Sequence, residues 1–225
     1  MDIEIRHSPS FAVARATLAS GESVRAESGA MMATSAGVEV EAKMEGGIMK
    51  GLRRSVLGGE SLFVTRFIAP PTGGWVDFAA RLPGDLITIP VAGAVNLSRG
   101  SWLCSSDGVE IDTKWGGMKN LAGGEGGFVV RAEGQGEVVA ACYGALDLVD
   151  LADGEAYVLD SGHMVAFSDG MAFTTRKVSS GLMQTLKSGE GFVFEFTGPG
   201  RLWIQSRNPH EFLGWLTNEL PFSRG

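Results

Sequence analysis

Cysteine and histidine are scarce in this chain of 225 residues, which has two cysteines and three histidines. Cys104 and Cys142 lie far apart and in apolar surroundings, which excludes the close spacing of a zinc site and the disulfide framework of a small secreted protein. We expect both thiols to be free and buried. His7, His163 and His210 never lie near one another, so the clustered ligands of a metal-binding β-barrel are absent. The sequence predicts no metal site and no cofactor.

Positive charge and long apolar runs are also lacking. The chain has 19 basic and 26 acidic residues, a net charge of -7, and none of its thirds is net positive. This balance argues against nucleic acid as a partner, because phosphate contacts require a basic face. No apolar run approaches the length of a membrane span, and residues 1–6 lack the cationic start of a signal peptide. We expect a cytoplasmic protein.

Catalytic motifs are incomplete wherever they are sought. The glycine-rich run 46–55 has Leu52 where a phosphate-binding loop requires lysine, and the run at Gly124 lacks the third glycine of a dinucleotide fingerprint. Neither cysteine has a histidine nearby in the sequence to act as a base. Three glutamates recur at glycine turns, where a structural role is the simpler interpretation: Glu60, Glu125 and Glu190. The sequence predicts a protein that is not an enzyme, with no catalytic residues.

Glycine, by contrast, is abundant. The 33 glycines are about 15% of the chain, roughly twice the usual share. With 44% hydrophobic and 20% charged residues, the composition is that of a globular protein with a core. Glycine at this frequency, without a strict period, predicts many short strands joined by turns.

The glycines mark an internal repeat. A Leu-x-(x)-Gly-acid signal occurs at residues 18–22, 82–85 and 151–155, and extended segments follow at 23–27, 86–91 and 156–160. Gly37, Gly108 and Gly170 then form turns that precede strands of alternating polarity. Further glycine turns at Gly59, Gly124 and Gly189 stand 65 residues apart.

This pattern predicts an all-β protein of one compact body, residues 1–225. It contains three tandem repeats of a β-sandwich-like module, at about 11–81, 82–150 and 151–209, arranged about a pseudo-threefold axis. A short helix is predicted over 209–220, with Asn208 as its N-cap and Pro209 at its first position. We expect this amphipathic helix to dock on a sheet edge, because sheet edges need covering.

A loop over residues 44–57 mixes apolar and basic side chains in a glycine-rich setting. Its candidate interaction residues are Ile48, Met49, Lys50, Leu52, Arg53 and Arg54. Such a loop folds back on its own module, contacts a second subunit, or contacts an anionic membrane surface or another ligand. The sequence leaves these alternatives open.

Several of these motifs carry a family resemblance, namely residues 27–32, 46–55, 59–63, 198–200 and 205–209. Through them the chain resembles the mitochondrial biogenesis family named for altered inheritance of mitochondria, over nearly its whole length. The resemblance implies a β fold akin to that of the tryptophan RNA-binding attenuator, repeated three times, and a homo-oligomer. It implies no enzyme activity and no catalytic residues.

The leading functional hypothesis is a non-enzymatic β scaffold that self-associates and offers its loops to a protein or membrane-surface partner. The alternative is a small-ligand-binding protein or an enzyme with a site between modules, lined by Trp102, Trp115 and Tyr143. RNA binding is a third hypothesis, which the acidic balance opposes.

Overall fold

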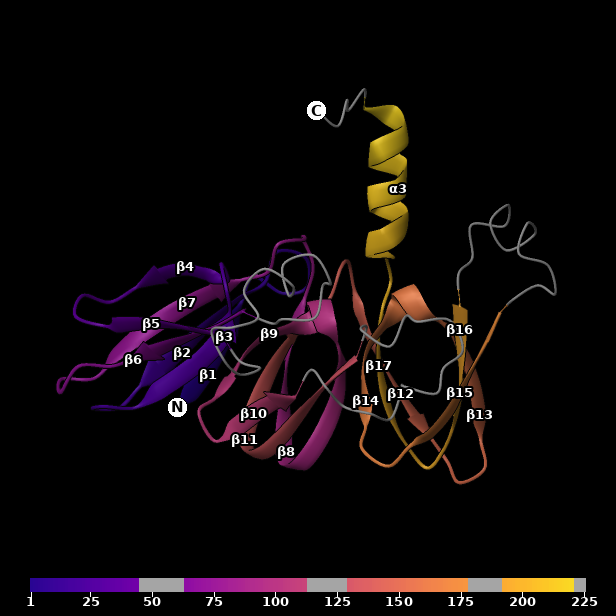
Figure 1. Ribbon diagram of the computed structural model, residues 1–225, viewed down its shortest axis with the longest axis horizontal. Helices are drawn as coiled ribbons and strands as arrows, with labels where there is room; N and C mark the ends of the chain where they lie inside the picture. Colours follow the sequence, from indigo (N-terminus) through magenta and orange to yellow (C-terminus); the bar gives the residue numbers. More distant parts are fainter. Residues whose placement is uncertain (45–62, 113–128, 178–191, 221–225) are drawn as a thin grey trace.

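The computed structural model describes residues 1–44, 63–112, 129–177 and 192–220, which form β-sheets and one C-terminal α-helix (Figure 1). The prediction of a mostly β protein with a short terminal helix is confirmed. The N-terminal strand group consists of β1 (Asp2–Arg6), β2 (Val13–Leu18), β3 (Ser23–Glu27), β4 (Met31–Thr34), β5 (Glu39–Met44), β6 (Phe63–Ile68) and β7 (Gly74–Ala79).

The middle and C-terminal strand groups follow in the chain. The middle group consists of β8 (Leu86–Ser98), the 3-10 turn η1 (Arg99–Ser101), β9 (Trp102–Ser106), β10 (Val109–Asp112) and β11 (Val129–Ala141). The C-terminal group consists of β12 (Leu146–Leu151), β13 (Ala156–Asp160), the 3-10 turn η3 (Ser161–His163), β14 (Met164–Ser168), β15 (Ala172–Lys177), β16 (Phe192–Thr197) and β17 (Gly200–Gln205).

The strands form where the sequence alternates. In β10, Val109 and Ile111 are buried whereas Glu110 and Asp112 are exposed, so one face of the strand meets the core and the other meets water. Turns at Gly108 and at its counterparts Gly37 and Gly170 precede these strands, as predicted. The predicted strands 23–27 and 156–160 are β3 and β13.

Strand pairing joins the three groups. A four-stranded sheet has the order β1-β2-β7-β4, and a three-stranded sheet has the order β13-β16-β15. The ten-stranded sheet runs through all three groups, because β3 pairs with β9 and β8 pairs with β14. We call these two pairings the internal junctions.

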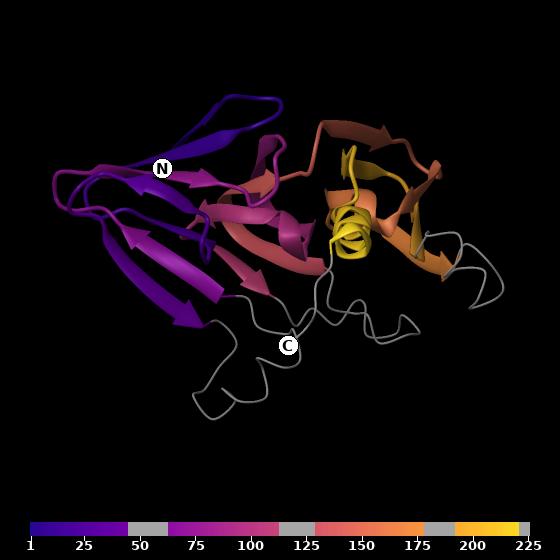
Figure 2. The same cartoon turned by 90° about the horizontal axis from the view of Figure 1, so that it is seen from above.

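The groups lie in a row along the long axis, with β4 near one end and β13 near the other (Figures 1 and 2). In the described residues β4 does not pair with β13, so strand pairing does not close the row into a ring. The predicted pseudo-threefold axis is therefore not confirmed.

Three hydrophobic clusters follow one another along the row, each centred on one group and extending into a neighbouring group. Phe78 is central to the N-terminal cluster, Trp102 to the middle one, and Phe167 and Phe196 to the C-terminal one. All four rings are almost fully buried. Burial of an aromatic or large aliphatic side chain contributes about 1.5–3 kcal/mol. Because each cluster includes residues of a neighbouring group, it stabilises the contact between groups as well as the group itself.

One pairing pattern recurs in all three groups. The pairs are β4 with β7, β9 with β11 and β14 with β17, and in each the second strand is the last of its group. The register of each pair shifts by one residue near the start of the first strand. The extra residues at these bulges are Met32 in β4, Leu103 in β9 and Val165 in β14.

The helix α3 (Pro209–Glu219) begins where predicted, with the Asn208 side chain accepting a hydrogen bond from the backbone N–H of His210. However, it stands away from the body (Figure 1) and has no buried residue. Its described ring contact with the body is Phe212 against Tyr143, with ring centroids 5.7 Å apart. The expectation that it docks on a sheet edge is wrong, because the helix projects from the strands and buries none of its residues.

Candidate functional site

The predicted interaction loop lies outside the described residues, as do Trp115 and the three recurring glutamates. The roles assigned to Ile48, Met49, Lys50, Leu52, Arg53 and Arg54 therefore stay predictions. The other residues expected to line a crevice between modules do not do so together. Trp102 has no exposed surface, and Tyr143 contacts Phe212 at the base of α3.

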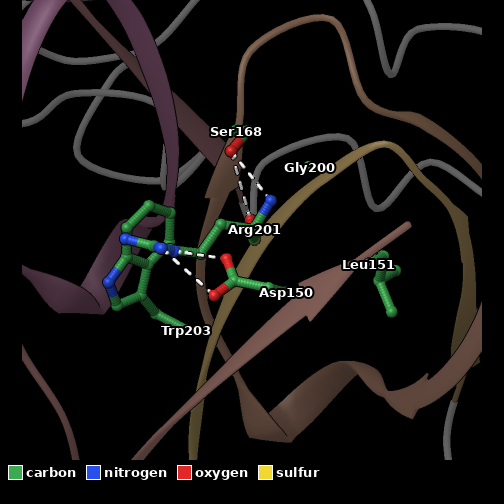
Figure 3. A pocket seen from close by; sticks show the side chains of 6 residues that line it. All are labelled: Asp150, Leu151, Ser168, Gly200, Arg201 and Trp203. Atoms are coloured by element: carbon green, nitrogen blue, oxygen red, sulfur yellow. Dashed lines mark hydrogen bonds and ion pairs between the residues drawn. The ribbon is translucent and has the colours of Figure 1, made fainter. Parts of the chain in front are cut away.

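A shallow hollow of about 370 Å³ lies over β12, β14 and β17 (Figure 3). Its lining residues all belong to the C-terminal group: Asp150, Leu151, Ser168, Gly200, Arg201 and Trp203. They meet because Asp150 stands directly opposite Arg201 in the β12–β17 register, while Ser168 ends the neighbouring strand β14. The hollow therefore lies within one group and not between groups.

The charges in this hollow neutralise each other. Arg201 donates to both carboxylate oxygens of Asp150, at 2.6 and 3.1 Å, and its guanidinium carbon lies 6.0 Å from the centre of the Trp203 ring. The hydrogen bond from Arg201 lowers the pKa of Asp150. The Ser168 hydroxyl accepts the backbone N–H of Arg201, and no histidine lies among the lining residues. The arrangement is an exposed ion pair, and Ser168 has no imidazole base in the lining to activate it.

A second ion-pair cluster lies on the outer face of the N-terminal group. Asp77 is buried and accepts hydrogen bonds from Arg15, at 2.7 and 2.8 Å, and from Arg6, at 2.9 Å. Arg15 also lies 4.0 Å over the ring of Trp75. The hydrogen bonds from Arg15 lower the pKa of Asp77. These contacts tie β1, β2 and β7 together, which is a structural role.

The two thiols and the imidazole of His163 occupy structural positions. Cys104 and Cys142 are free and buried, as predicted, and burial raises the pKa of both thiols. A buried thiol with a raised pKa is a poor nucleophile. The Nδ1 atom of His163, which belongs to η3, lies 2.7 Å from the backbone oxygen of Gln205. Within the described ranges, no three metal-ligating side chains converge, and no helix is long and apolar enough to span a bilayer.

Arginine-to-aspartate contacts cross both internal junctions. At the first, Arg66 of β6 donates to both carboxylate oxygens of Asp107, which follows β9. At the second, Arg131 of β11 donates to Asp169, which follows β14, at 3.0 Å. Sequence reasoning singled out both Asp-Gly turns but missed the arginines, because their partners lie 41 and 38 residues away.

Two strand edges at the ends of the row carry exposed apolar side chains. Among the described residues, β4 pairs with β7 alone and β13 pairs with β16 alone. Met31 and Met32 on β4 are 44% and 54% exposed, and Val158 on β13 is 49% exposed. Unpaired strand edges with apolar side chains are the surfaces at which β proteins associate. These edges, together with α3, are the candidate interaction surfaces.

An equivalent hydrogen bond occurs in each of the three groups and was not predicted from the sequence. Ser35, Ser106 and Ser168 each stand two residues before a turn glycine, and each hydroxyl accepts a backbone N–H at 3.0 Å from the last strand of its group. The donors are the N–H groups of Trp75, Glu137 and Arg201. The signal that could have revealed it is the Ser-x-Gly pattern at all three turns.

Comparison with known proteins identifies relatives over almost the full chain. The chain is 30% identical over 232 residues to an uncharacterized protein of Streptococcus pyogenes serotype M6, covering 99% of this chain and 92% of the relative. It is also similar to the X-ray crystal structure of a protein from Streptococcus pyogenes, with a TM-score of 0.80 and 27% identity. That match covers 97% of this chain and 99% of the other.

The family model described as "Mitochondrial biogenesis AIM24" matches residues 3–207. The matched residues include all of the described strands except Asp2, the first residue of β1. The family resemblance seen in the sequence motifs is confirmed: this chain belongs to the AIM24 mitochondrial biogenesis family.

Proposed function

We propose that the three strand groups are copies of one module. The support is that each group contains the same bulged strand pair and the same serine-to-backbone hydrogen bond. The turns of the first and third groups also agree in detail. Glu22 accepts the backbone N–H of Ala19, and Glu155 accepts that of Ala152, at 2.8 and 2.9 Å.

In this proposal the middle module has fused strands. The first half of β8 pairs with the second half of β11, and this pair corresponds to β2 with β7. The second half of β8 pairs with the first half of β11, and this pair corresponds to β3 with β6. Gly93 and Gly134 stand opposite each other where the halves meet, both with positive φ. In this proposal residues 86–91 correspond to β2, and residues 94–98 correspond to residues 23–27 of β3.

We infer that this protein is a non-enzymatic β scaffold of the cytoplasm that self-associates. The observation that carries the proposal is the pair of strand edges, β4 and β13, that leave large apolar side chains exposed at the two ends of the row. Apolar residues at an unpaired edge favour association with another strand. The acidic net charge disfavours RNA or an anionic membrane as the partner of these edges.

The alternative of a small-ligand site between modules has less support. The hollow of Figure 3 lies within the C-terminal group, and its arginine is engaged by Asp150. Trp102, expected to line such a site, is completely buried. We therefore retain the scaffold as the proposed function.

Sedimentation velocity of the purified chain over a hundredfold range of concentration tests the proposal. A sedimentation coefficient that rises with concentration supports self-association. A monomer throughout the range, up to tens of micromolar, contradicts it. Native mass spectrometry of the same sample tests the alternative, because a retained small molecule would favour ligand binding.

A further inference from the structure

We propose that β13 of one copy pairs antiparallel with β4 of a second copy, joining copies head to tail. The inference rests on the proposed self-association and names the surfaces that carry it. The occupant of the β4 edge is thus β13 of another copy, and the occupant of the β13 edge is β4 of another copy. The argument comes from the two internal junctions, which show how the same strands pair inside one chain.

The two internal junctions share one geometry. At the first, Arg25 of β3 stands opposite Ser105 of β9, and at the second, Asn96 of β8 stands opposite Phe167 of β14. Both pairings are antiparallel and span three residues on each strand. In both, the second strand belongs to the next group and is also bulged against the last strand of its own group.

The edges of β4 and β13 are the unused halves of this junction. β4 has the bulge and the serine hydrogen bond of β9 and β14, so it corresponds to the strand that receives the preceding group. β13 pairs with β16 as β3 pairs with β6, so it corresponds to the strand that joins the following group. The first group has no preceding group and the third has no following one.

Carrying over the junction register places Val158 of one copy opposite Thr34 of the next. The neighbouring pairs are then Leu159 with Ala33 and Tyr157 with Ser35. This register follows from the alignment of the turns at Gly29, Gly100 and Gly162, which precede β4, β9 and β14.

Burial supports this assignment. The bulge residues Leu103 and Val165 are 2% and 0% exposed in the groups that have a preceding neighbour, whereas Met32 is 54% exposed. On the other strand, Asn96 is 1% exposed at its junction, whereas its counterpart Val158 is 49% exposed. Thus the positions that a neighbouring group covers inside the chain carry exposed apolar side chains at the two ends.

Charge also permits the pairing. At the ends of the row, Glu195 stands at the position of the junction arginine and Ala36 stands at the position of the junction aspartate. Since the aspartate position is Ala36, Glu195 meets no like charge from that position. The junction between copies therefore depends on backbone pairing and apolar contacts, without the ion pair.

A single chain cannot make this pairing with itself, because β4 and β13 lie at opposite ends of the row (Figure 1). The interface between copies is consequently heterologous, which produces open chains of copies or a closed ring. Neither β4 nor β13 contains lysine or arginine, so an anionic membrane is a poorer occupant than a second copy.

Disulfide trapping tests the register directly. One chain carries Thr34→Cys and another carries Val158→Cys, and the two are mixed under mild oxidation. We expect a disulfide-linked dimer in the mixture. The matched control replaces Val158→Cys with Leu148→Cys, on the edge strand β12 with 47% exposure, and should give no such dimer. The native thiols are buried and do not interfere.

Charge substitution provides the second measurement, by sedimentation velocity, with circular dichroism to verify folding. Val158→Glu should weaken association at least about tenfold, and adding Thr34→Lys to the same chain should restore it. Leu148→Glu is the control and should leave association unchanged.

The outcomes separate the two proposals. If the wild-type chain associates but neither trapping nor Val158→Glu behaves as expected, this junction is wrong and self-association stands. If the wild-type chain is monomeric at every concentration, both are wrong. A monomer that binds phosphatidylserine vesicles, and loses that binding in Val158→Glu, would assign the edge to a membrane and likewise overturn the junction.

Discussion

Arg66 donates hydrogen bonds to both carboxylate oxygens of Asp107, at 3.1 and 2.8 Å, and thereby ties β6 of the N-terminal group to the turn after β9 of the middle group. Arg25 adds a third hydrogen bond to the same carboxylate, at 3.0 Å. The first internal junction is therefore held by an ion-pair network as well as by strand pairing.

Replacing Asp107 should loosen that junction. We expect Asp107→Ala to lower the free energy of unfolding by about 2 kcal/mol, because two partly buried arginines lose their shared acceptor. Urea denaturation followed by tryptophan fluorescence measures the change. Glu110→Ala, at an exposed position on β10, is the control and should change stability by less than about 0.5 kcal/mol. Equal effects of the two substitutions would contradict the structural role of the network.

Acid should destabilise the protein partly through Asp77. Hydrogen bonds from Arg15 and Arg6 lower the pKa of Asp77 in the folded state. Its contribution is fully present above the unfolded-state pKa of about 3.9 and is lost as pH falls through the lower folded-state pKa. Unfolding free energies measured between pH 7 and pH 2 should therefore fall at the acid end. Asp77→Asn should be less stable at pH 7 and show a shallower acid decline, whereas an unchanged acid slope would exclude this carboxylate.

Gly84 permits a close approach of two chain segments. It forms a parallel bridge with Gly144, and a Cβ atom at Gly84 would lie 1.9 Å from the backbone oxygen of Cys142. Gly84→Ala should cost about 3 kcal/mol or more, because the backbone must shift. Gly100→Ala is the matched control, since a Cβ atom there meets nothing within 4 Å. Thermal unfolding of the two variants compares them, and similar melting temperatures would be inconsistent with the close approach.

Neither native thiol should react while the chain is folded. Cys104 has no exposed surface, and burial raises its pKa, so the reactive thiolate is disfavoured. Mass spectrometry after incubation with a maleimide should show no adduct in buffer and two adducts in concentrated urea. Rapid labelling of Cys104 in buffer would indicate that the strands around it open readily.

The cap of α3 should control mainly the helix, because the cap contacts the body, among the described residues, through one long hydrogen bond from Asn208 to Asp160, at 3.4 Å. The Asn208 side chain accepts the N–H of His210, so Asn208→Ala should destabilise the helix by about 1 kcal/mol. Trp215→Ala, at a position 58% exposed, should leave the thermal unfolding of the sheets unchanged. Hydrogen exchange would show faster exchange over α3 in Asn208→Ala and unaltered protection in β17. Loss of protection in β17 would mean that helix and sheet are coupled.

Much of the strand content could be predicted because it depends on local pattern. The alternation in β10 and the turn at Gly108 before it fix that strand from neighbouring residues alone. The helix was likewise encoded locally, by Asn208 and Pro209 at its start. In contrast, the extended segment 86–91 was predicted to end before Gly93, whereas β8 continues through Gly93 to Ser98.

The candidate surfaces were much harder to predict. The exposure of Met32 and Val158 depends on which strand lies beside β4 and β13, and that is a property of long-range pairing. In sequence these residues resemble Leu103 and other core positions, which are buried. The position of α3 away from the body could not be predicted either, because a periodic apolar stripe indicates which face of a helix is apolar but not what that face contacts.

The two internal junctions form between strands on one polypeptide, so each strand meets its partner at the high effective concentration that tethering provides, typically in the millimolar range. An end-to-end junction has no tether and must draw its partner from bulk solution. The same strand geometry is thus insensitive to protein amount inside the chain and sensitive to it between chains. The number of chains in one assembly would then increase with the expression level, and a single chain with its three groups would be the repeating unit.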